Sequence, residues 1–149
     1  MRIYLFKIAM FLYMQSFAQF TGSVSYQEEG ISFEIPSNWY GQELEEAFTM
    51  SSYSEAGLIA LVFHPAKTMN ALIAEMKNGL QDDGINLYPT SNITNNGKNR
   101  AEAAYGGVME GYQVKGKAFA LSNPYGQGVV VFSLVSHELY TNRTYELAN

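Results

Sequence analysis

Cysteine is absent from the 149 residues, which excludes disulfide bonds, thiol catalysis and thiolate metal sites. Charged residues make up only 15% of the chain and hydrophobic residues 47%, a composition too apolar for a disordered tail. Internal repeats, low-complexity segments and a Pro/Gly/Ser-rich linker are also lacking. We therefore predict one globular domain over residues 19–149.

The first residues have the pattern of a secretory signal. Arg2 and Lys7 precede an apolar run over residues 8–14, which is shorter than the roughly 20 residues needed to cross a bilayer. The run is followed by Ser16-Phe17-Ala18, the small-x-small pattern of a cleavage site. We predict a signal peptide over residues 1–18 and an exported product, periplasmic or extracellular, without stable membrane insertion after cleavage.

The charge balance argues against nucleic acid as a partner. Loss of Arg2 and Lys7 with the signal leaves 7 of the 9 basic residues against 14 acidic ones, whereas phosphate binding needs clustered positive charge. The only concentration of basic residues is spread from Lys98 to Lys117, and we interpret it as solvated strand edges and loops.

Hydrophobic periodicity predicts two strands and a helix in the first half of the domain. Residues 30–36 alternate between apolar and polar, as in a strand with one buried face, and residues 57–63 form a continuous apolar run typical of a strand buried on both faces. The spacing after Thr68, the expected cap, predicts an amphipathic helix with Gly84 as its stop. Residues 42–55 fit either a strand pair or a helical turn.

The second half reads as an antiparallel meander. Three segments, residues 103–109, 112–121 and 128–136, have strand patterns and are separated by turn-forming residues. From His137 the residues favour a terminal helix. The chain stops at Asn149 within that expected helix, so either the helix frays or the sequence is truncated.

The order of these segments is similar to the Mog1/PsbP-like family, especially its small secreted bacterial members. The resemblance rests on residues 30–39 with Pro36-Ser37-Asn38-Trp39, on the helix over 68–79, and on residues 122–129. It implies an α+β fold in which an antiparallel β-sheet is flanked by helices, an α/β/α sandwich. It also implies a role as a binding or assembly accessory, but no site motif of the family is matched.

Catalytic candidates are few. His64 and His137 could join a carboxylate in a two-histidine metal site or act as a base, but a separation of 73 residues gives them no local geometry. Adjacent carboxylates occur at Glu28-Glu29, Glu45-Glu46 and Asp82-Asp83, where neighbouring side chains point in different directions. Because no nucleophile, metal or nucleotide motif is present, we predict no catalytic residue, no metal and no cofactor.

Aromatic residues in or near expected loops are the best binding candidates. Trp39, Tyr53, Tyr88 and Tyr125 could stack on a partner, although Trp39 could instead fill the base of the core. We predict a secreted, non-catalytic accessory or binding domain that acts on a protein or another cell-envelope partner. The alternatives are a small envelope hydrolase with a His/carboxylate site and a structural assembly subunit.

Overall fold

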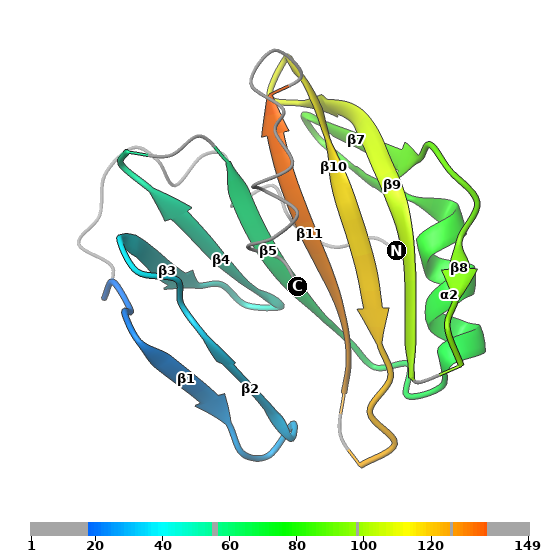
Figure 1. Cartoon of the computed structure of the whole chain (residues 1–149), viewed down its shortest axis with the longest axis horizontal. Helices are drawn as coiled ribbons and strands as arrows, with labels where there is room; N and C mark the ends of the chain where they lie inside the picture. The colour runs from blue at the N-terminus through cyan, green and yellow to red at the C-terminus, as the bar shows by residue number, and fades with distance from the viewer. Residues whose placement is uncertain (1–17, 55–56, 98, 126, 137–149) are drawn as a thin grey trace.

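The computed structural model describes residues 18–54, 57–97, 99–125 and 127–136, and within them the protein is mainly β (Figure 1). A curled, half-barrel antiparallel sheet forms the body of the molecule. Its strands in spatial order are β3 (Trp39–Glu43), β4 (Ala47–Ser52), β5 (Leu58–His64), β11 (Gly128–Ser136), β10 (Tyr112–Leu121), β9 (Arg100–Met109), β7 (Ile85–Pro89) and β6 (Leu80–Asp82). The short β8 (Thr94–Asn95) also pairs with β9.

Two further strands, β1 (Ser23–Tyr26) and β2 (Ile31–Glu34), form a separate hairpin. In this hairpin Val24, Tyr26, Ile31 and Phe33 are half-buried, whereas the residues between them are exposed. Alternation of this kind gives the hairpin one apolar face, which must be buried against another layer.

The expected α/β/α sandwich is wrong. The one helix in the described ranges, α2 (Met69–Asn78), covers one face of the sheet, and the β1–β2 hairpin covers the other. The hairpin has the apolar face that a second helical layer would otherwise supply. The terminal helix expected from His137 lies outside the described residues.

The sheet has a core on each face, as the alternation along β5 shows. Ala60 and Val62 pack with Leu72 and Met76 of α2 in a helix-side core. Ile59 and Leu61, which alternate with them along β5, pack with the hairpin on the other face. We call this the hairpin-side core; it is built from Ile35, Trp39, Phe48, Met50, Ile59, Leu61, Phe119, Val129 and Val131. The prediction that residues 57–63 form a strand buried on both faces is therefore confirmed.

The other predicted strands and the helix cap are confirmed, whereas the predicted end of the helix is wrong. Residues 42–55 contain strands, because β3 and β4 pair as a hairpin, and the meander of β9, β10 and β11 is confirmed. Thr68 caps α2 as expected, but the predicted stop at Gly84 is wrong. The helix ends before Gly79, where a side chain would collide with the carbonyl of Leu87, and Gly84 instead lies in the turn between β6 and β7.

The α2 helix has 10 residues. Throughout the described ranges, no helix has the length and apolar character needed to span a membrane.

Tyr105 should make stability sensitive to alkaline pH. Its side chain is 1% exposed, its hydroxyl donates a hydrogen bond to the carbonyl of Met76, and its ring meets Phe132 edge-on at 5.4 Å. Burial raises the pKa of Tyr105 above its ordinary value of about 10. The neutral form is thus favoured in the folded state, so this stabilisation is present below pH ~10 and is lost as the pH rises above it.

We expect the Tyr105→Phe variant to lose about 1 kcal/mol at pH 7 through the missing hydrogen bond. It should also lose less stability than the wild type between pH ~10 and 11, because one tyrosine contributes a slope of up to about 1.4 kcal/mol per pH unit. Urea unfolding across this range measures both effects. Tyr125→Phe, at a 93% exposed position, is the control, and equal slopes in the two variants would contradict the assignment.

Candidate functional site: a cleft beneath the hairpin

The four aromatic residues predicted to bind a partner do not gather in one place. Trp39 is 3% exposed in the hairpin-side core, which agrees with its alternative interpretation as a core residue. Tyr125 is 93% exposed in the loop after β10, and Tyr53 is 82% exposed after β4, stacked on Tyr40 at 4.6 Å. Tyr88 is 50% exposed on β7, close to the opposite edge of the sheet.

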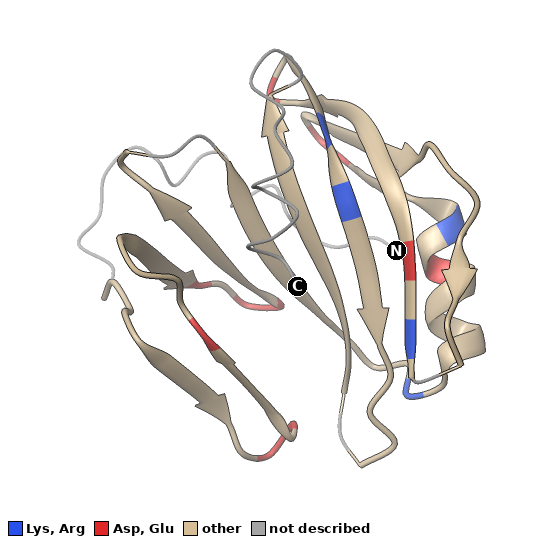
Figure 2. Cartoon of the chain, in the orientation of Figure 1, with Lys and Arg blue, Asp and Glu red and all other residues tan. Residues whose placement is uncertain are grey.

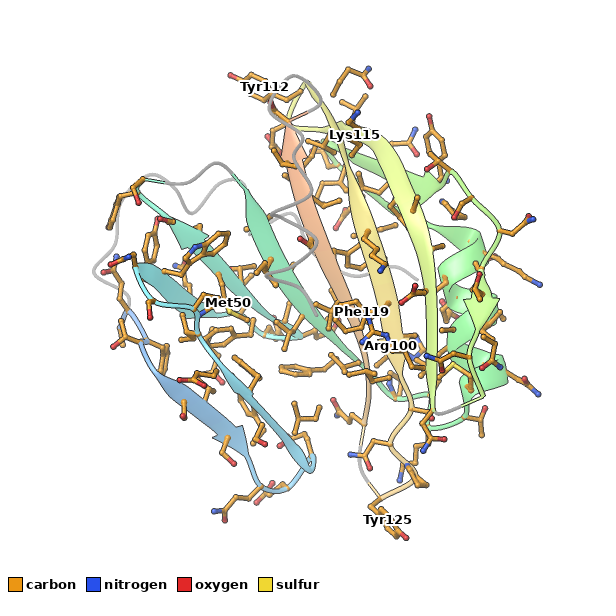
Figure 3. The ribbon with its side chains drawn as sticks, in the orientation of Figure 1. Met50, Arg100, Tyr112, Lys115, Phe119 and Tyr125 are labelled. Carbon is orange, nitrogen blue, oxygen red and sulfur yellow. The ribbon has the colours of Figure 1, made fainter. Side chains whose placement is uncertain are left out.

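One further exposed tyrosine, Tyr112, begins β10 and lies at the opposite end of that strand from Tyr125 (Figure 3). The exposed tyrosines thus point to different parts of the surface. No continuous aromatic patch joins those that the structure describes.

A cleft does lie between β2 and the hairpin-side face of the sheet. Its volume is about 330 Å³, within the lower range of small-ligand sites. We call it the hairpin cleft; it is lined by Ile31, Ser32, Phe33, Glu34, Pro36, Met50, Ile59, Leu61, Arg100, Phe119, Leu121, Val129 and Val131. Apart from β2, most of this lining is aliphatic or aromatic.

A guanidinium group marks the wall opposite β2. Arg100 lies over the ring of Phe119, with 4.3 Å between the guanidinium carbon and the ring centroid, a cation–π contact. The same side chain forms an ion pair with Glu102 at 3.2 Å, and Lys117 reaches Glu102 at 3.3 Å. Figure 3 shows Arg100 and Phe119 together on the strands that face the hairpin.

The β9–β10 register explains this cluster. Phe119 is paired with Glu102 and Leu121 with Arg100, so diagonal neighbours on one face include Arg100 with Phe119 and Lys117 with Glu102. Arg100 and Lys117 belong to the basic residues that we interpreted as solvated strand edges and loops. In the structure both form an ion pair with the carboxylate of Glu102. The alternation from Lys115 to Phe119 could have placed these residues on one face, but their partners on β9 depend on the register.

The tip of the hairpin is tied to the loop between β10 and β11. The side-chain amide of Asn123 donates to the carbonyl of Glu29 at 2.8 Å. This bond joins residues 94 positions apart and holds the hairpin beside the strands that line the cleft.

A second, acidic pocket of about 650 Å³ lies around His64. It is lined by Tyr26, Glu29, Glu43, Leu44, Glu45, Glu46, Phe63, His64, Pro65 and Gln127, and Figure 2 shows the acidic residues on the hairpin and on the turn between β3 and β4. Burial, then a hydrogen bond to Glu43 and the nearby charges of Glu43 and Glu29, raise the pKa of Tyr26. In the described part of the chain, no group of three or more histidine, aspartate or glutamate residues could hold a metal ion.

His64 is poorly arranged to act as a base. Its Nδ1 accepts a hydrogen bond from the amide of Ala66 at 3.0 Å, which leaves the proton of the neutral ring on Nε2. Nε2 lies 3.9 Å from Glu75 Oε2, beyond the roughly 2.6–3.2 Å reach expected for a base–orienter pair. The partner considered for His64, His137, lies outside the described residues.

A third groove, of about 400 Å³, opens on the helix side of the sheet. Its walls include Tyr40, Leu58, Met109, Tyr112 and Ser136.

Comparison of the chain with protein-family models, with curated protein sequences and with solved structures found no match. The resemblance to the Mog1/PsbP-like family therefore stays a prediction. Among the pockets described above, the hairpin cleft combines a mainly apolar lining with a guanidinium group.

Proposed function

We propose that this protein is an exported, non-catalytic binding module that holds an apolar segment of a protein or of another cell-envelope component in the hairpin cleft. The observation that carries the proposal is the cleft itself, a space between two layers with a mainly apolar lining in which Glu34 and Arg100 are the charged residues. Apolar sites with a few placed polar groups are typical of ligand binding. Export rests on the signal pattern of residues 1–18.

The apolar lining provides the attraction in this proposal. Burial of apolar surface contributes roughly 25 cal/mol per Å². Arg100 and Lys117 share the one carboxylate of Glu102, so this wall keeps a net positive charge that favours a ligand whose apolar part ends near an anionic group. Tyr125, in the loop next to Asn123, lies on the same loop that holds the hairpin tip and is the exposed aromatic residue closest in sequence to that contact.

Binding of the anionic apolar dye 1-anilinonaphthalene-8-sulfonate tests the proposal. We expect Leu121→Asp to weaken dye binding by about tenfold, since it adds a charge to the apolar lining and repels the sulfonate. Leu121 is 37% exposed at the end of β10, so the fold should tolerate the change. Fluorescence titration of the full chain measures the dissociation constant.

Tyr112→Asp is the matched control, because Tyr112 is also exposed, begins the same strand and lies outside the cleft. It lines the helix-side groove instead. If Tyr112→Asp weakens dye binding and Leu121→Asp does not, the apolar site is in that groove and the proposal fails.

A further inference from the structure

One edge of β2 carries backbone groups that face the hairpin cleft. The hairpin is a two-stranded sheet in which β2 pairs only with β1 among the described strands. The amide of Ile35 donates to the carbonyl of Gly22 at 2.9 Å, and this bond fixes the phase of the ladder. Hydrogen-bonded pairs alternate in an antiparallel ladder, so Ile31 and Phe33 turn their backbone groups toward β1.

The residues between them turn their backbone groups the other way. Ser32 and Glu34 direct an amide and a carbonyl each toward the edge that β1 does not occupy, and both residues line the cleft. In Figure 1, β1 borders one side of β2, and β11 and β10 lie on its other side. In the described ranges no other strand pairs with it.

We propose that the cleft binds an extended peptide strand, which pairs with the free edge of β2 and turns alternate apolar side chains toward Phe119, Val129 and Val131. This inference rests on the proposed function and names its ligand class. The added strand would extend the two-stranded hairpin sheet over the hairpin-side face of β11 and β10, a form of β-augmentation.

A peptide fits this wall better than a lipid chain does. An acyl chain lying against β2 would cover the amides and carbonyls of Ser32 and Glu34 without pairing them, and each polar group left buried and unpaired is costly. A peptide strand forms hydrogen bonds with these groups and directs every second side chain toward the wall of the cleft. On the opposite wall Arg100 and Lys117 share the one carboxylate of Glu102, and the remaining positive charge favours a peptide with a carboxylate at its inward-facing end.

Proline substitutions test the two outer edges of the hairpin independently. Ser32→Pro removes the amide that faces the cleft, and it leaves the ladder with β1 intact because that amide takes no part in it. Ser25→Pro is the matched control. Ser25 is the cross-strand partner of Ser32, so its amide faces the outer edge of β1, away from the cleft.

The probe is an acetylated and amidated peptide of alternating valine and threonine residues that ends in glutamate. Isothermal titration against the full chain should show binding at least about tenfold weaker for Ser32→Pro and within about twofold of the wild type for Ser25→Pro. An extended peptide has two edges, and each can be blocked separately by N-methyl groups on its amides. The version methylated on the edge that pairs with β2 should also bind at least about tenfold weaker. Trp39 fluorescence reports whether each variant keeps its hairpin-side core.

Three results would overturn the inference. The first is unchanged binding to Ser32→Pro; if the dye still responds to Leu121→Asp, the proposed function stands without strand pairing. The second is equal loss of binding in both proline variants, which means that hairpin integrity rather than the edge is required. The third is a wild-type dimer that Ser32→Pro dissociates and that binds no peptide, which would make a second copy of this chain the occupant.

Discussion

Alanine in place of Gly116 is expected to lower the free energy of unfolding by about 3 kcal/mol or more, a large effect for one methyl group. A Cβ at this position would lie 1.8 Å from the carbonyl oxygen of Ser133 and 3.0 Å from the Cα of Leu134. These atoms belong to the backbone of β11 in the middle of the sheet, so they cannot move aside as a flexible side chain could. Equilibrium unfolding in urea measures the loss.

Gly106→Ala is the control for this prediction. Gly106 lies in the neighbouring strand β9, and a Cβ there would meet the methyl group of Thr90 at 3.2 Å. Because a side-chain methyl can yield by a few tenths of an ångström, we expect a change within about 1 kcal/mol. Similar losses in both variants would show that close backbone approach at Gly116 is not the cause.

Phe48→Ala is expected to destabilise the protein by about 3–5 kcal/mol, the usual range for truncating a buried phenylalanine. Phe48 is fully buried and meets Phe33 of the hairpin at 4.9 Å and Phe20 at 5.7 Å, both edge-on. Its ring also occupies the space beside Gly41, where a Cβ would lie 2.3 Å away. The variant leaves a cavity at the point where the hairpin rests on the sheet.

The emission of the single tryptophan, Trp39, provides a second readout of this variant, since Trp39 lies in the same hairpin-side core. We expect a red shift in folded Phe48→Ala as water reaches the indole. Phe63→Ala serves as the comparison, because Phe63 is only half-buried beside Tyr26 at 5.1 Å, and it should cost about 1–2 kcal/mol. An unshifted Trp39 spectrum in Phe48→Ala would contradict a role for Phe48 in seating the hairpin.

Local patterns predicted about half of the elements in this fold. The apolar run of β5, the meander of β9 to β11 and the cap at Thr68 were each visible in a short stretch of sequence. The end of α2 was misplaced because Leu80 continues the helical spacing of apolar residues, although it belongs to β6. The close approach of Leu87 to Gly79 is a tertiary contact that periodicity does not contain.

The layers were not predictable in the same way. An alternating strand over residues 30–36 was expected, but alternation does not say which surface its apolar face will cover. The hairpin cleft depends further on the placement of β2 over strands that are distant in sequence, such as β11. Arg100, Ser32 and Leu121 carried no signal of a shared site, because only the fold brings them together.

The hairpin has few links to the main sheet besides side-chain packing. The described polar links are the isolated bridge between Phe20 and Gly41, the hydrogen bonds from the Asn123 amide to the carbonyls of Glu29 and Gly30, and the hydrogen bond between Tyr26 and Glu43. A ladder of backbone hydrogen bonds would couple the two layers into one cooperative unit, whereas packing alone allows one layer to lift while the other stays folded. We therefore expect the β1–β2 hairpin to behave as a separate foldon, whose amides exchange with solvent through openings that leave the half-barrel intact.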